Sequence, residues 1–115
     1  MRMSSERMIK LLAMYTGVTT SELVGPSRLA YIVEARHAAM VIMRERMGLT
    51  YPHIAKIMGN RHHSVGIYAV QKPREGAFGE LIRDLNRELD AYVAENPEYL
   101  PRAASEQEKG TTGPL

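Results

Sequence analysis

The sequence predicts an all-α protein. Apolar residues recur at three- and four-residue spacing in several segments, capping residues and glycines bracket those segments, and no stretch alternates polar and apolar residues as a half-buried strand does. The 115 residues, 44% of them hydrophobic, suffice for one compact domain with a modest core and are too few for two. We therefore expect a helical domain over residues 1–95 and a disordered tail over residues 96–115, where apolar groups are too sparse to fold.

Two short helices are expected first. Ser4 or Ser5 can cap the first helix, and Gly17 ends it. Thr19 is followed three residues later by Glu22, which is a capping-box pattern and predicts a short helical turn, because each side chain can bond the backbone N–H of the other residue. The apolar stripe of the first helix consists of Met8, Leu11, Leu12 and Tyr15.

A long helix over residues 28–47 is expected to form the centre of the core. Ser27 opens it and Gly48 ends it. Its broad apolar surface consists of Ile32, Val33, Ala35, Ala39, Met40, Ile42 and Met43. A helix with so wide an apolar surface is expected to contact neighbours on more than one side.

A helix-turn-helix pattern occupies residues 50–72. Thr50 caps its first helix, and Pro52 falls within the first turn, where its missing N–H has little effect. Gly59 ends that helix, and the second helix is expected over residues 61–72. In a DNA-binding helix-turn-helix, the start of the second helix lies at base edges in the major groove.

An amphipathic helix is expected to close the domain. Its apolar positions keep helical spacing over about four turns and consist of Phe78, Leu81, Ile82, Leu85, Leu89, Tyr92 and Val93. This stripe is most simply part of the core. The alternative is a homodimer contact, because paired helices would place two reading helices on successive half-sites. The opposite carboxylate stripe of Glu80, Asp84 and Glu88 is expected to face water.

The charge is unevenly distributed along the chain. Residues 26–74 carry eight basic and two acidic groups (+6), whereas residues 75–115 carry four basic and nine acidic groups (−5). All four histidines also fall within residues 26–74. A cationic body beside an acidic element is the asymmetry expected of a protein that meets a polyanion with one face. There is no cysteine, hydrophobic leader or membrane span, so we expect a cytoplasmic protein associated with the nucleoid.

Three stretches of the chain match a known family: VTTSELVG, SRLAYIVEARHAAMVIMRE and LTYPHIAKIMGNRHHSV. With these stretches, residues 18–75 resemble the C-terminal DNA-binding domain of the bacterial replication initiator DnaA. The last stretch corresponds without gaps to the family's signature, in which a Gly-Gly-Arg-Asp-His-Thr-Thr-Val run opens the recognition helix. The resemblance implies a compact, Trp-repressor-like helical fold, to which the amphipathic helix described above is a C-terminal addition. It also implies binding to double-stranded DNA.

The resemblance also implies individual contacts. The expected base contacts are His62, His63, Ser64 and Val65 in the major groove and Arg36 in an adjacent minor groove. The expected phosphate contacts are Arg28, Tyr51, Pro52, Lys56, Arg61 and Lys72. Imidazole and hydroxyl groups both donate and accept hydrogen bonds, which suits base recognition.

This chain departs from the family pattern at its recognition helix. His62 stands where the family carries aspartate, Val65 and Gly66 replace a threonine and a valine, and the basic loop shrinks to residues 25–28 with Glu34 nearby. We therefore expect a preferred DNA sequence that differs from a DnaA box.

The rotation of the second helix about its axis is open to two interpretations. A generic helix-turn-helix template buries Val65 and Tyr68, whereas the DnaA template buries Ile67 and Val70 and leaves Val65 free to touch a thymine methyl group. We favour the second, because the first would expose two large aliphatic side chains to water or DNA.

The function expected is sequence-specific binding of double-stranded DNA, in a bacterial or phage regulator of transcription or replication initiation. No ATPase activity, nucleotide or other cofactor is expected, because the chain has no G-x-x-x-x-G-K-[ST] loop. No metal site is expected at His62 and His63, because adjacent helical residues point about 100° apart. The alternative is an adaptor that binds a protein through the acidic last helix. An enzyme is not expected.

Overall fold

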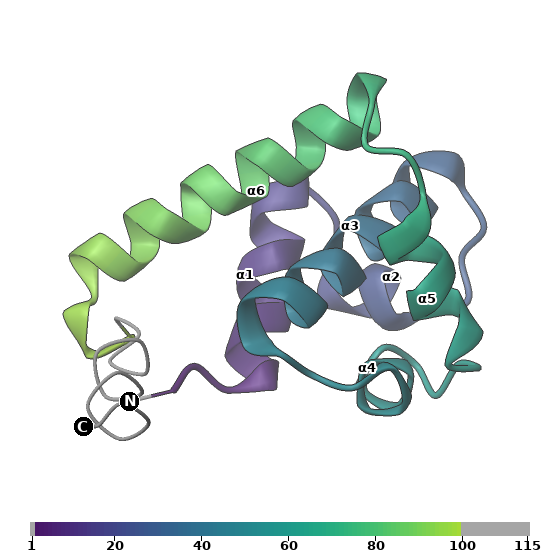
Figure 1. The fold of residues 1–115 in the computed structure, drawn as a ribbon, viewed down its shortest axis with the longest axis horizontal. Helices are drawn as coiled ribbons and strands as arrows, with labels where there is room; N and C mark the ends of the chain where they lie inside the picture. The colour runs from purple at the N-terminus through teal and green to yellow at the C-terminus, as the bar shows by residue number, and fades with distance from the viewer. Residues whose placement is uncertain (1, 100–115) are drawn as a thin grey trace, which may run out of the picture.

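The structure is a computed structural model that describes residues 2–99, and these residues form six α-helices and one 3-10 turn with no strand among them. The chain runs through α1 (Ser5–Thr16), α2 (Thr20–Val24), α3 (Ala30–Met47), α4 (Tyr51–Ile57), α5 (Ser64–Gln71), α6 (Gly76–Glu95) and η1 (Pro97–Tyr99). The helices pack into one body, with the long α6 lying across α1 and α3 (Figure 1). The all-α prediction is confirmed.

Side-chain caps begin three of the helices as predicted. The Ser4 hydroxyl accepts the N–H of Arg7 at 3.1 Å, and the Thr50 hydroxyl accepts the N–H of His53 at 3.2 Å. The backbone N–H of Thr19 donates to the Glu22 carboxylate at 2.9 Å, and the N–H of Glu22 donates to the Thr19 hydroxyl at 3.0 Å. These bonds satisfy amide groups that have no partner within the helix.

The other two predicted helix starts, at Ser27 and at residue 61, were too early. The α3 helix begins at Ala30, because Leu29 is still extended at φ −60° and ψ 134°. The α5 helix begins at Ser64. The backbone N–H of Arg61 donates instead to the carbonyl of Ala55 at 2.9 Å, so residues 61–63 belong to the turn that follows α4.

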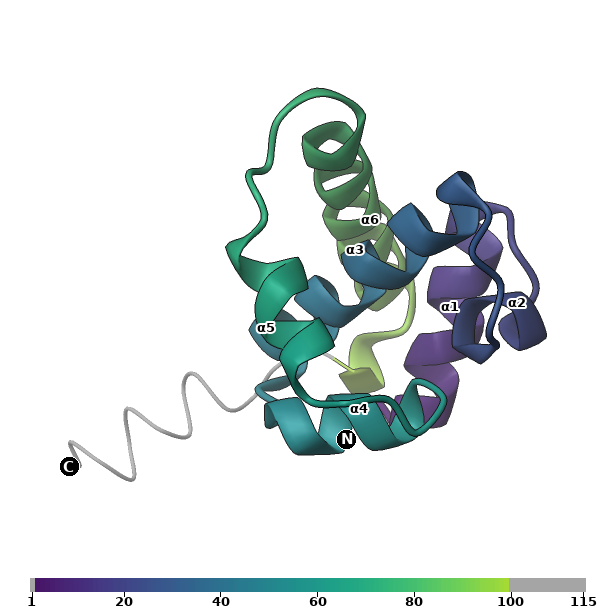
Figure 2. The same ribbon diagram turned by 90° about the vertical axis from the view of Figure 1, so that its right-hand side faces the viewer.

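Helix α3 lies at the centre of the molecule, in contact with each of the other five α-helices (Figure 2). Four consecutive residues, Met40 to Met43, are all buried, which is possible only when a helix is surrounded. The prediction of a central core helix is confirmed. Every other helix, including the one that begins at Ser64, is positioned against it.

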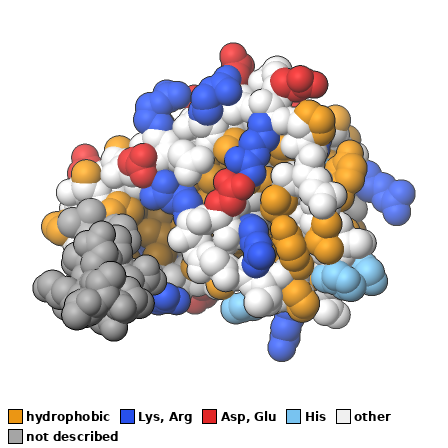
Figure 3. All heavy atoms as spheres, in the orientation of Figure 1, with side chains coloured by type: hydrophobic (Ala, Val, Ile, Leu, Met, Phe, Trp, Pro, Cys, Tyr) orange, Lys and Arg blue, Asp and Glu red, His pale blue; other side chains and the backbone are white. Residues whose placement is uncertain are grey.

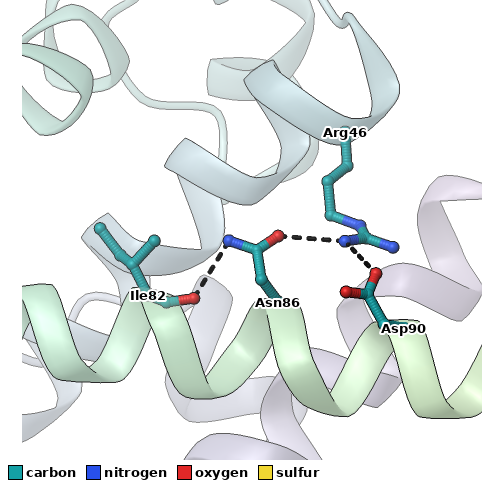
Figure 4. A network of polar contacts seen from close by, with 4 residues as sticks. All are labelled: Arg46, Ile82, Asn86 and Asp90. Carbon is teal, nitrogen blue, oxygen red and sulfur yellow. Dashed lines mark hydrogen bonds and ion pairs between the residues drawn. The ribbon is translucent and has the colours of Figure 1, made fainter.

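Helix α6 is fixed to this core by apolar and polar contacts. Its apolar stripe, including Phe78, Ile82, Leu85 and Leu89, is buried against α1 and α3. Arg46 of α3 donates to the Asp90 carboxylate at 2.9 Å and to the side-chain oxygen of Asn86 at 3.1 Å (Figure 4). The prediction that the stripe belongs to the core is confirmed. A homodimer through this helix would have to use its exposed, acidic face.

The folded part of the chain extends beyond residue 95, where we expected it to end. Pro97–Tyr99 form a 3-10 turn, and the Tyr99 ring stacks on Tyr92 with centroids 6.0 Å apart. Residues 96–99, which we expected to be disordered, therefore continue the folded domain. The rest of the expected tail, residues 100–115, lies outside the described part of the chain. Within residues 2–99, no helix is both long enough and apolar enough to cross a membrane.

Candidate nucleic-acid interface

The turn between α4 and α5 presents its polar side chains to solvent. His62, His63 and Ser64 are all exposed. The turn lies on the side of the molecule away from α6, in both views of the ribbon (Figures 1 and 2). Figure 3 shows histidine side chains next to hydrophobic ones at the right-hand end of the molecule, where Figure 1 places α5. The acidic helix therefore does not cover this surface.

His62 orders the start of the recognition helix. Its Nδ1 atom accepts the backbone N–H of Ser64 at 3.2 Å and lies 2.8 Å from the Ser64 hydroxyl. Its ring stacks on His63 with centroids 4.4 Å apart and planes at 29°. His62 thus does the capping that the N-cap residue His63 does not do, and its Nε2 atom remains for an outside partner. Both rings are held in place before any partner arrives.

Arg36 is not where a minor-groove contact would require it. The side chain is buried, at 4% exposure. Its Nε, Nη1 and Nη2 atoms donate to the carbonyls of Leu23, Ser27 and Glu22 at 2.8, 3.0 and 3.0 Å. Burial lowers the pKa of this guanidinium, and the nearby charge of Arg61 lowers it further. The expected base contact of Arg36 is therefore wrong: the residue satisfies two carbonyls at the end of α2 and one in the loop that follows.

Arg61 is also used inside the protein. Its Nε atom donates to the carbonyl of Met58 at 2.7 Å, and its Nη2 atom donates to the carbonyls of Val24 and Gly25. These bonds join the loop after α2 to the turn before α5. Arg61 is half-buried and these bonds use its Nε and Nη2 atoms, so its expected phosphate contact stays a prediction. Carbonyl partners do not neutralise a guanidinium, so Arg36 and Arg61 still contribute positive potential beneath the turn.

The remaining expected phosphate contacts divide into two groups. Arg28, Pro52 and Lys56 are exposed, and within residues 2–99 neither Arg28 nor Lys56 has a side-chain hydrogen bond or ion pair. Tyr51 is half-buried beneath the guanidinium of Arg44, which lies 4.5 Å from its ring centroid.

The half-buried Lys72, for which we expected a phosphate contact, touches two other side chains, and that phosphate contact stays a prediction. Its ammonium lies 4.3 Å from the centroid of the Phe78 ring and 3.4 Å from Nδ1 of His37. These contacts hold the ammonium at the C-terminal end of α5, whereas the exposed histidines lie at the other end. Lys72 therefore connects the end of α5 to α3, through His37, and to α6, through Phe78.

The rotation of α5 matches neither template completely. Gly66 and Ala69 are buried, and Val65 and Val70 pack against the core from either side. Val65 is half-buried rather than fully exposed, and its expected base contact stays a prediction. Gly66 lies close to α4: a Cβ atom there would be 3.2 Å from Cδ1 of Tyr51, so the helix packs through its glycine.

The opposite side of α5 carries side chains that the sequence analysis did not assign to DNA. Tyr68 is 58% exposed, and Ile67 is half-buried but lies outside the core cluster, although the favoured template buries it. Gln71 is exposed. With Ser64 these residues follow i, i+3, i+4 and i+7 spacing, which defines one helix face. The spacing of these four residues is visible in the sequence, but the direction in which this helix face points is not.

His37 lies behind the outward face and supports it. The half-buried ring meets Tyr68 edge-to-face, with centroids 5.5 Å apart and planes at 68°. Burial lowers the pKa of His37 to about 4, with further lowering by Lys72, Arg36 and Arg61 in that order. The imidazole is therefore neutral near pH 7, and the Tyr68 ring has a neutral partner in this edge-to-face contact.

Comparison with known proteins identifies relatives of this chain. The chain is 37% identical over 70 residues to the chromosomal replication initiator protein DnaA of Corynebacterium jeikeium (strain K411), covering 61% of this chain and 12% of that protein. It is 32% identical over 74 residues to the protein of the same name from Thermomicrobium roseum, covering 64% of this chain and 16% of the relative. The protein of that name from Clavibacter sepedonicus is 38% identical over 63 residues, covering 55% and 13%.

The matches are therefore confined to a small part of these larger relatives. The family described as the bacterial dnaA protein helix-turn-helix matches residues 5–72, from the start of α1 to the end of α5. A helix-turn-helix is a DNA-binding arrangement rather than a catalytic one. The chain belongs to the bacterial dnaA protein helix-turn-helix family, and its fold is that of a DNA-binding domain.

Proposed function

We propose that this protein binds double-stranded DNA in a sequence-specific manner, with the start of α5 in the major groove. The observation that carries the proposal is the exposed His62, His63 and Ser64 group on an ordered turn, opposite the acidic α6 helix. Exposed polar groups at the start of the second helix are what a helix-turn-helix needs to reach base edges.

The side chains divide into base-reading and phosphate-binding roles. His63 and Ser64 offer donors and acceptors to base edges, and Nε2 of His62 can add a third polar contact. Among the expected phosphate contacts, Arg28 and Lys56 are the exposed cations, and we assign them to phosphates. The link from Arg61 to Val24 and Gly25 holds the loop that carries Arg28 beside the turn.

The biological role proposed is regulation of transcription or replication initiation, without ATPase activity, in the cytoplasm at the nucleoid. The named relatives are chromosomal replication initiators, but the chain spans only 12–16% of their length. The alternative role is that of an adaptor that binds a protein. It would use the exposed acidic face of α6, because the apolar stripe of that helix is buried.

Selection of bound duplexes from a random pool, followed by sequencing, tests the proposal directly. We expect His63→Ala to flatten the base preference at the positions it reads, because a major-groove donor and acceptor are lost. Lys56→Ala should weaken all duplexes alike and reduce the slope of log affinity against log salt by about 0.9. His53→Ala, which removes an exposed histidine from α4, is the matched control and should keep the preference.

Two results would count against the proposal in different ways. If no duplex is enriched even at low salt, the protein does not bind DNA through this surface, and the adaptor role becomes the better explanation. If duplexes are enriched but His63→Ala and Lys56→Ala lose affinity equally over the whole pool, the assigned roles of these residues are wrong.

A further inference from the structure

We propose that Ile67 and Tyr68 form an apolar surface on α5 that selects thymine through its C5-methyl group, one helical turn beyond Ser64. The inference rests on the proposed function, because it requires α5 to lie in the major groove. It concerns side chains for which the sequence analysis gave no DNA role and which the core does not use.

The direction of the two side chains follows from what α5 buries. Gly66 and Ala69 mark the inward side of the helix. At about 100° per residue, Ser64 and Gln71 then lie along the middle of the outward side, with Ile67 and Tyr68 to either side of that line. The outward side therefore combines two polar and two apolar side chains at adjacent positions.

Tyr68 differs from the other exposed large hydrophobic residues in where it lies. It is 58% exposed and stands on the outward side of α5, one turn beyond Ser64. The edge-to-face contact with His37 fixes the ring, so little side-chain entropy is lost when a partner binds. An aromatic ring held rigid and left open to solvent is a feature of binding surfaces.

The chemistry of the groove identifies the target. Among base edges in the major groove, the C5-methyl group of thymine is the apolar one. Residue 68 lies four residues beyond residue 64, or about 6 Å along the helix axis. That length corresponds to roughly two base steps at about 3.4 Å each. We therefore expect the apolar preference to lie about two base pairs from the position that Ser64 reads.

Replacement of single thymines by deoxyuridine in the selected duplex tests the inference, because it removes only the methyl group. Wild-type protein should lose about fourfold in affinity at one or two thymines, which is the value of one buried methyl group. Ile67→Ala and Tyr68→Ala should bind the thymine and deoxyuridine duplexes equally at the position that each residue contacts. Tyr68→Phe keeps the ring and should keep the discrimination.

Tyr31→Ala is the matched control. Tyr31 is a tyrosine of similar exposure, at 60%, near the start of α3. Its replacement should leave the thymine-to-deoxyuridine ratio unchanged, whatever it does to total affinity. Far-UV circular dichroism of each variant shows that the fold is kept, and the ratio within one variant cancels any loss of folded protein.

The failure of this inference is distinguishable from the failure of the proposed function. If wild-type protein selects a duplex that has no thymine near the Ser64 position, or binds the deoxyuridine duplexes as well as the parent, the inference is overturned while DNA binding stands. The same holds if Ile67→Ala and Tyr68→Ala both keep the wild-type ratio. If no duplex is selected, the proposed function fails first and the inference falls with it.

Discussion

Replacement of Arg36 by glutamine separates two roles for the same residue. The family resemblance places this arginine in a minor groove, whereas the structure buries it under three backbone carbonyls. A DNA contact would affect binding and leave the fold intact. A structural contact would affect the free energy of unfolding and leave base preference intact. The variant therefore has opposite expected results under the two interpretations.

The expected loss of stability follows from the hydrogen bonds. Glutamine is shorter than arginine and has one amide nitrogen in place of three guanidinium nitrogens, so we expect it to restore at most one of the three bonds. Two buried carbonyls without partners cost about 1–3 kcal/mol each, and relief of the buried charge offsets part of this. We therefore expect Arg36→Gln to lower the free energy of unfolding by about 3 kcal/mol. A domain of this size has roughly 5–15 kcal/mol in total, so the variant should still fold.

Urea unfolding followed by circular dichroism measures this change. With a slope of roughly 1–1.5 kcal/mol per molar urea, the midpoint should fall by about 2–3 M. The control is Arg28→Gln, at an exposed arginine with no ion pair within residues 2–99, which should change stability by less than about 0.5 kcal/mol and weaken DNA binding. A stable Arg36→Gln protein that has lost preference for AT-rich flanks would refute the structural role.

Three further predictions concern stability. The pKa of His37 is about 4 in the folded protein and 6.5 in the unfolded chain, so below pH 6.5 the unfolded chain binds a proton that the folded protein does not. The contribution of His37 to folding stability is therefore present above pH 6.5 and is lost as the pH falls towards 4. After discount for solvent screening, we expect His37 to contribute about 1–2 kcal/mol to the free energy of unfolding. Urea titrations at several pH values measure this as the difference in pH dependence between wild type and His37→Gln. Gly59→Ala should destabilise by more than about 2 kcal/mol, because φ is +98° and the new Cβ would lie 2.1 Å from the carbonyl oxygen of Val24. Gly17→Ala, at φ +79° but in open space, should cost about 1 kcal/mol, and equal effects on Tm would contradict the steric argument. Leu85→Ala should cost about 2–5 kcal/mol if α6 belongs to the core, and a loss below 1 kcal/mol in urea unfolding would show that it does not.

Structural features that depend on residues a few positions apart could be predicted from the sequence. The capping box of Thr19 and Glu22 is local, because the groups that bond are three residues apart. The apolar stripe of α6 follows from helical spacing, as does the central position of α3. The resemblance to DnaA includes the stretch from residue 49 to residue 65, and this stretch identified the turn that the structure exposes.

The roles of the cations needed the tertiary structure. Arg28 and Arg36 are the same residue type on neighbouring segments, yet one is exposed and the other is buried. The partners of Arg36 are carbonyls 9–14 residues away, and those of Arg61 include carbonyls 36 and 37 residues away. No local pattern encodes such bonds, because they exist only after α2 has packed beside the turn.

The direction in which α5 faces was also decided by packing. Its sequence allows more than one apolar side, and the choice depends on which backbone can approach α4 most closely. Gly66 admits the ring of Tyr51, so the helix turns that side inward and leaves Ile67 and Tyr68 outward. The sequence by itself determined that the second helix of a helix-turn-helix exists and where it begins to within three residues. The contact between α4 and α5 decided which side chains of α5 face outward. The sequence could not show this, because a helix fixes only the angles among its own residues.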